Sequence, residues 1–243
     1  TPQTVTVTGA DDSIIDGTIT SIATVAVDDA NSDNDFDAVV DQTVSVDTTD
    51  DDVAGFTIVE LDGATEVDES GTTDTFTVVL DAQPSDNVVI AMSSSDIGEA
   101  TISGTISFTP ANWDTPQTVT VTGVDENTID GDQTSTVTIT IVDSISDSDF
   151  SNVADQTVSV VTTDDDVAGF TIVELDGATE VDESGTTDTF TVVLDAQPTS
   201  DVVLTITSDD TGEATVNSPL TFTPVNWDTP QTVTVTGADD SII

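Results

Sequence analysis

The chain lacks lysine, arginine, histidine, cysteine and tyrosine altogether. The absence of cysteine excludes disulfides, and the absence of lysine excludes isopeptide cross-links from a lysine side chain. The 243 residues include 49 Asp and Glu, so the formal charge is -49 at pH 7 and no salt bridge between side chains is possible. Two carboxylates about 4 Å apart repel each other by roughly 4 kcal/mol at an effective dielectric constant of about 20. A fold that gathers these acids therefore needs a cation from outside.

The missing residue types also exclude several classes of function. Nucleic-acid binding depends on Lys and Arg to neutralise phosphates, and anionic membrane surfaces repel an acidic chain. No apolar run is long enough to span a membrane. A pair of carboxylates can hydrolyse a glycoside, but near-identical repeats without a unique insertion offer no cleft for one. We therefore expect no enzyme activity, no nucleic-acid partner and no membrane insertion.

The chain is built from a long internal repeat. The segment TPQTVTVTG begins at Thr1, Thr115 and Thr229, which gives a register of 114 residues, and residues 53–84 and 167–198 are identical over 32 positions. A period of this length corresponds to a whole domain rather than to one turn of a solenoid. Because residues 229–243 duplicate residues 1–15, we expect an ordered excerpt of a longer tandem protein.

One full repeat, residues 53–166, shows the pattern of β-strands and no helical periodicity. High charge with only 4% aromatic residues is also found in disordered chains, but the period-two apolar runs of this repeat argue for strands. Seven strands in about 110 residues fit an immunoglobulin-like antiparallel sandwich, all-β with no helices beyond short turns. The predicted strands are 56–61, 75–80, 88–92, 100–108, 117–122, 134–141 and 156–161.

The same register predicts the domain organisation. Residues 1–52 form the C-terminal half of a preceding repeat, residues 53–166 a complete one, and residues 167–243 the N-terminal half of a following one. In each core the bulky candidates are Phe76, Phe108 and Trp113 or their register mates. Trp113 is assigned to the core or its edge, with a sugar-stacking platform as the alternative.

Three groups of acidic residues are predicted to meet at one pole of the sandwich. They lie around the first strand and the turn after it, between the fifth and sixth strands, and at the end of the seventh. These positions share one end of a seven-stranded sandwich, and calcium takes about six to eight oxygen ligands of this kind. The groups are Glu60, Glu66, Asp68 and Glu69; Asp125, Glu126, Asp130 and Asp132; and Asp164, Asp165 and Asp166.

Other acids have competing interpretations. Asp143, Asp147 and Asp149 lie at the opposite pole, and their D-x-D spacing lacks the Gly and the distal Glu of an EF-hand loop, so they are either solvated loop acids or ligands. A halophilic surface, on which acids hold hydration, explains isolated residues such as Asp74 and Asp81. It does not explain the triplet Asp164–Asp166 beside a second acidic loop, which would be costly without a cation.

The motifs DDDVAGFTIVE, VDESG, SGTISFTP and QTVTVTGVDENTIDGDQ, closed by a second DDD, resemble the Calx-beta domain of sodium/calcium exchangers and bacterial surface proteins. The resemblance covers nearly all of each repeat and implies an immunoglobulin-like sandwich that binds Ca²⁺. It implies the ligands Glu60, Asp125, Glu126, Asp130, Asp164 and Asp165, with Glu174, Asp11, Asp12, Asp16, Asp50 and Asp51 in the other copies. The candidate set also includes Glu69 and Asp166 and their register mates Asp52 and Glu183.

The chain departs from the family pattern at two places. Gln133, and Ile19 in the first copy, stand where the pattern has an acid. The family's Asp between the third and fourth strands has no clear partner, although Asp96 and Glu99 lie close in the sequence. We therefore expect fewer ions than in the exchanger, about one to three per repeat.

These observations lead to a structural function. We predict a repeat of a giant secreted bacterial surface protein or extracellular filament, in which calcium stiffens a stalk or fibre. The partners are then the neighbouring repeats and other copies in a fibre or bundle. The alternative is an adhesive module that binds carbohydrate or protein on another surface, with weak sites added by avidity.

Overall fold

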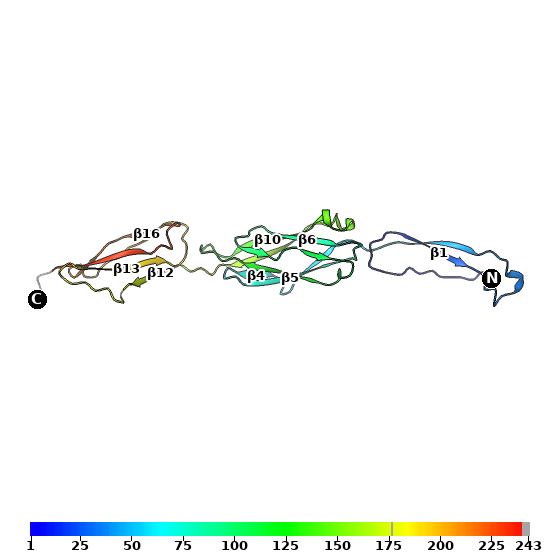
Figure 1. The fold of residues 1–243 in the computed structure, drawn as a ribbon, viewed down its shortest axis with the longest axis horizontal. Helices are drawn as coiled ribbons and strands as arrows, with labels where there is room; N and C mark the ends of the chain where they lie inside the picture. Colours follow the sequence, from blue (N-terminus) through cyan, green and yellow to red (C-terminus); the bar gives the residue numbers. More distant parts are fainter. Residues whose placement is uncertain (176, 240–243) are drawn as a thin grey trace.

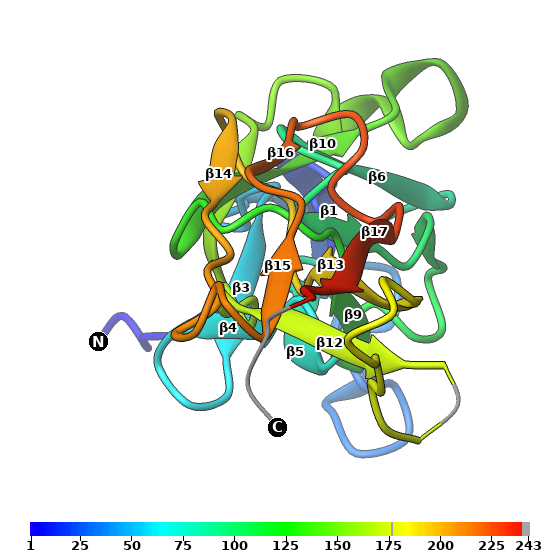
Figure 2. The same cartoon turned by 90° about the vertical axis from the view of Figure 1, so that its left-hand side faces the viewer.

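The computed structural model describes residues 1–175 and 177–239 and confirms an all-β fold. Apart from strands it contains the short 3-10 segments η1 (Asn34–Phe36), η2 (Asp143–Ile145) and η3 (Ser148–Phe150). The chain forms a row of β-structures, with the termini toward opposite ends (Figure 1). Viewed along the row, these structures overlap (Figure 2). Within the described residues, no helix has the length and apolarity needed to cross a membrane.

The central segment, residues 53–166, is a sandwich of two sheets. One sheet has the order β3-β5-β9-β7 and the other the order β4-β11-β10-β6-β8. All pairings within them are antiparallel except that of β4 with β11, which is parallel. The strands are β3 (Phe56–Glu60), β4 (Thr65–Asp68), β5 (Thr73–Leu80), β6 (Val88–Ser94), β7 (Ala100–Ile102), β8 (Ile106–Phe108), β9 (Gln117–Gly123), β10 (Gln133–Ile141) and β11 (Gln156–Thr163).

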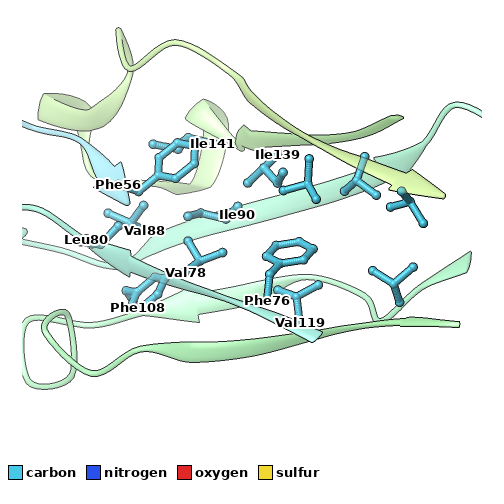
Figure 3. Packing of buried hydrophobic residues seen from close by; sticks show 14 of the residues in the cluster. Phe56, Phe76, Val78, Leu80, Val88, Ile90, Phe108, Val119, Ile139 and Ile141 are labelled. Atoms are coloured by element: carbon cyan, nitrogen blue, oxygen red, sulfur yellow. The ribbon is translucent and has the colours of Figure 1, made fainter. Parts of the chain in front are cut away.

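The core follows from the alternation of side chains along these strands. In β9 the inward residues Val119 and Val121 are fully buried, while the threonines between them face outward. Phe76 and Phe108 fill the space between the sheets with no exposed surface (Figure 3). Trp113 packs partly buried against the same cluster, as expected for a core-edge residue.

The structure adds detail that the strand pattern did not give. The predicted run 100–108 divides into β7 and β8, which belong to different sheets. β4 was expected to be part of a turn, yet its buried Thr65 and Val67 alternate with exposed Glu66. Four residues are too few for a clear period-two signal, and only the parallel pairing with β11 reveals the strand. This pairing carries Glu69 to the end of β11.

The flanking segments repeat parts of this architecture. The pairing of Ile19 with Thr48 in the N-terminal segment matches that of Gln133 with Thr162 in the central one. Val25 is 61% exposed there, whereas its mate Ile139 is fully buried. The remaining strands are β1 (Ile19–Val25), β2 (Gln42–Thr48), β12 (Phe170–Glu174), β13 (Thr187–Leu194), β14 (Val202–Leu204), β15 (Ala214–Val216), β16 (Leu220–Phe222) and β17 (Gln231–Gly237). The domain boundaries at residues 52/53 and 166/167 stay a prediction.

A close backbone approach holds the end of β9 against the turn after β4. The Gly123 N–H donates to the Thr72 carbonyl oxygen at 3.0 Å, and a Cβ on Gly123 would collide with the backbone of Asp68. Glycine is therefore required where β9 enters the loop that follows it.

We predict that Gly123→Ala destabilises the central segment by about 1–3 kcal/mol, the usual cost of overpacking. Urea denaturation followed by Trp113 fluorescence, in a Trp227→Phe background, measures the change. Gly104→Ala is the control, because a Cβ there meets no atom within 4 Å. Equal stability of the two variants would contradict the proposed close contact.

Candidate metal centre

Glu69 is a buried carboxylate without a hydrogen-bond partner. Its backbone N–H donates to the Thr163 carbonyl oxygen at 3.1 Å, at the end of β11. This bond draws the residue inward, and its side chain is fully buried. Within residues 1–175 and 177–239, neither carboxylate oxygen has a hydrogen-bond partner. An unpaired buried charge is strongly unfavourable, so this position calls for a proton or a cation.

Four other carboxylates surround Glu69. Its oxygens lie within 4.8 Å of those of Glu126 and Asp130 in one group, and of those of Asp164 and Asp166 in a second. We define these five residues as the acidic centre. They come from the turn after β4, the loop between β9 and β10, and the segment after β11, the three places that the sequence predicted to converge.

Hydrogen bonds from backbone N–H groups to the Asp164 carboxylate hold these loops in place. Gly131 has a left-handed φ of 75°, and its N–H donates to an Asp164 carboxylate oxygen at 2.7 Å. The Asp166 N–H donates to the other oxygen of Asp164 at 2.9 Å. The N-terminal segment repeats the tether, because Gly17 donates to Asp50 at 2.8 Å. The D-G sequence therefore positions the loop relative to the acidic triplet.

Burial and mutual repulsion raise the pKa values of carboxyl groups in the acidic centre. Burial, followed by repulsion from Asp164 and Glu126, raises the pKa of Glu69 from 4.5 to about 7. Burial, followed by repulsion from Asp164 and Asp165, also raises the pKa of Asp166. The chain has no lysine, arginine or histidine to offset this charge. A set of oxygen donors alone, with one buried unpaired member, fits a hard divalent cation such as calcium.

Glu99 belongs to the same region, although it is not among the candidates that the sequence predicts. Burial, followed by repulsion from Asp130, raises its pKa, and its Oε2 atom is buried without a partner. The Glu99 carbonyl oxygen accepts a hydrogen bond from the Val124 N–H at 2.9 Å, at the start of the β9–β10 loop. The only signal in the sequence was its closeness to the position between the third and fourth strands where the Calx-beta pattern has an Asp.

Several candidates are not gathered into the acidic centre. Glu60 accepts a hydrogen bond from the Thr65 hydroxyl at 3.1 Å. Asp125 and Asp165 contribute to the repulsion that raises the pKa of Asp166 but belong to neither group of ligand atoms. Asp68 caps the turn after β4, and hydrogen bonds from Ser70 lower its pKa. The role of each candidate as a ligand stays a prediction.

The described residues of the flanking segments include some counterparts of the acidic centre. One hollow in the N-terminal segment is lined by Asp11, Asp12, Asp16, Asp50, Asp51 and Asp52. In the C-terminal segment, Glu174 and Glu183 are exposed, and Glu183 lines a hollow with Asp182 and Glu213. The counterpart of Glu126 in this segment is Asp240, which lies outside the described residues.

At the opposite pole, Asp147 stabilises the fold by accepting hydrogen bonds from neighbouring loops. Its carboxylate accepts hydrogen bonds from the Ser85 N–H at 2.6 Å, the Asp86 N–H at 2.9 Å and the Asp149 N–H at 3.0 Å. Burial alone would raise its pKa, but these donors outweigh it and the pKa is lowered. Asp147 is therefore a buried structural acceptor rather than a solvated loop acid.

Comparison with known proteins gives weak similarities. No protein-family model and no curated protein matches the chain. The apo-form Calx CBD1 domain is 16% identical over 47% of this chain and all of that one, with a TM-score of 0.35. The calcium-binding domain CBD12 of CALX1.1 is 15% identical over 76% of each chain, with a TM-score of 0.34. Domains 4–9 of the surface layer protein SbsC are 20% identical over 85% of this chain and 30% of that one, with a TM-score of 0.35.

We predict that the metal-free protein loses stability as the pH rises from about 4.5 to about 7. Over this window folded Glu69 keeps its proton, because its pKa is about 7, while unfolded Glu69 releases it at its ordinary pKa of 4.5. At Glu69 the folded state binds more protons than the unfolded state, so the contribution of this residue to stability is greatest below the window and falls through it. Urea denaturation in excess chelator at several pH values measures this.

Glu69→Gln isolates the contribution of this residue. The amide does not titrate, whereas Glu99, Asp166 and the other acids stay in both proteins. The variant should therefore show a shallower loss of stability over the same pH window. Identical slopes for the two proteins would contradict the raised pKa of Glu69.

Proposed function

We propose that the chain is part of an array of β-sandwich spacers, each stiffened by calcium at the end that meets the next repeat. The observation that carries this is Glu69, a buried unpartnered carboxylate among four other carboxylates. The acidic centre ends with Asp166, directly before the next copy of VAGF at residue 167. A cation bound there would remove the repulsion at the joint between repeats.

The donor chemistry favours calcium over magnesium. Carboxylates from three separate loops give an irregular site, and calcium accepts variable geometry, whereas magnesium requires a tight octahedron and keeps its water. Extracellular calcium-binding modules typically work at dissociation constants of about 10⁻⁴–10⁻³ M. A site built of surface loops with oxygen donors suits that setting, so we place the spacer outside the cell or at its surface.

The repeat itself supports a spacer role within a stalk or fibre. Residues 53–84 and 167–198 are identical, so each unit presents the same front half to its neighbour. We retain the predicted division into residues 1–52, 53–166 and 167–243. The resemblance of the motifs to Calx-beta domains is consistent with calcium binding by such units, and giant bacterial surface proteins are the setting that this resemblance suggests.

We predict that calcium binds the chain and raises its stability. At a free concentration of 100 times the dissociation constant, one site adds about 2.7 kcal/mol to the free energy of unfolding. Isothermal titration calorimetry gives the affinity and stoichiometry, and thermal unfolding with calcium or chelator gives the stabilisation. Small-angle scattering should show a stiffer, more extended chain with calcium than with chelator.

Glu69→Gln should lose most of the stabilisation from the central site, and Glu66→Gln is the matched control. Both replace a carboxyl group with an amide of the same shape, but Glu66 is exposed on β4 and Glu69 is buried. Unchanged melting and scattering on calcium removal would overturn the proposal in favour of a halophilic surface. Equal calcium affinity of the two variants would place the ion elsewhere.

A further inference from the structure

The two joints between segments are built from the same contacts. At the first joint, the Gln83 N–H donates to the Ser13 carbonyl oxygen at 2.7 Å; at the second, the Gln197 N–H donates to the Asn127 carbonyl oxygen at 2.6 Å. Parallel β-bridges join Ile14 to Gln83 and Thr128 to Gln197. The loop between β9 and β10, residues 124–132, and its copy at residues 10–18 therefore pair with the next segment in the same register.

An isoleucine follows each bridge and meets apolar surface of the next segment. Ile15 packs against the core cluster of the central segment and lines a hollow with Val53, Ala54 and Val153. Its mate Ile129 lines a hollow with Ala168, Phe170 and Pro198 of the C-terminal segment. Ile129 is 39% exposed, so part of its surface is covered.

The glutamine of each joint is also fixed within its own segment. The side-chain amides of Gln83 and Gln197 donate to the carbonyl oxygens of Pro110 and Pro224, each at 2.7 Å. At the second joint, the Thr128 hydroxyl donates to the Gln197 side-chain oxygen at 3.3 Å. The receiving surface is therefore anchored, and the hydrogen bonds across the joint connect two supported elements.

The 124–132 loop thus has two separate contact surfaces. Glu126 and Asp130 contribute to the acidic centre, while Asn127, Thr128 and Ile129 contact the next segment. Each of the five carboxylates of the acidic centre lies within residues 53–166. A cation held by them would contact one segment only, and would need this loop to influence the orientation of the next.

We propose that the 124–132 loop is a peg that docks into the facing pole of the next repeat, and that Ile129 is the apolar residue that seats it. The partner surface is the pole formed by VAGF and the AQP turn, both within the 32-residue block that recurs unchanged. The proposed docking contact contains no metal ligand. A link between this contact and calcium rests on the proposed function: the bound ion would hold the 124–132 loop in place, and the loop would then hold the next segment in one orientation.

Spin labels test the orientation directly, because the chain has no cysteine of its own. Ser107→Cys and Thr221→Cys place labels on exposed, register-equivalent positions of the central and C-terminal segments. Double electron–electron resonance with saturating calcium should give a narrow distance distribution. Ile129→Ser, and separately Ala168→Gln on the receiving pole, should abolish this narrow distribution while calcium affinity measured by calorimetry is retained.

Ile145→Ser is the matched control, since Ile145 is 62% exposed on η2 and lies outside the joint; it should leave the distribution narrow. Narrow distributions in both the Ile129 and Ala168 variants would overturn the peg, even if calcium still stiffened the chain as proposed. If the parent binds no calcium but both variants broaden the distribution, the peg stands and the calcium-stiffened function fails.

Discussion

Repulsion among carboxylates, with no cationic side chain to balance it, is the constraint on which the rest of this structure depends. The fold meets it in part by keeping acids sparse on its sheets. Outward positions of β5 and β9 carry threonine in paired register, as in Thr75 opposite Thr120, and acids within strands, such as Glu66 and Asp74, are not buried. The most crowded acids lie in the turns and loops that form the acidic centre.

Asp147 and Glu69 show two different environments for a buried carboxylate in this protein. Asp147 is surrounded by backbone and hydroxyl donors, which lower its pKa, and it needs nothing more. Glu69 is equally enclosed but has no donor, so its pKa rises. The Asp147 carboxylate therefore holds loops of the fold together. The Glu69 carboxylate instead requires a proton or a metal ion to balance its charge.

The loop between β9 and β10 lies between the acidic centre of one segment and the surface of the next segment. Glu126 and Asp130 of this loop belong to the acidic centre of their own repeat, and Thr128 and Ile129 contact the next segment. Gly131 makes this possible, because its left-handed backbone turns its N–H toward Asp164. In the function that we propose, this short segment couples the electrostatic state of one unit to the placement of its neighbour.

The sequence by itself determined most strands of the sandwich, the inward valines of β9 and the places of the acidic groups along the chain, because period-two alternation and repeated motifs are read directly from the order of residues. It could not show that β4 pairs in parallel with β11, nor that Glu69 is buried rather than Glu66. It also left Glu99 outside the site and gave Asp147 no settled role. These depend on which loops meet in space. Burial and hydrogen-bond donors, supplied by residues far away in the chain, decide whether an acid is solvated, structural or available to a cation.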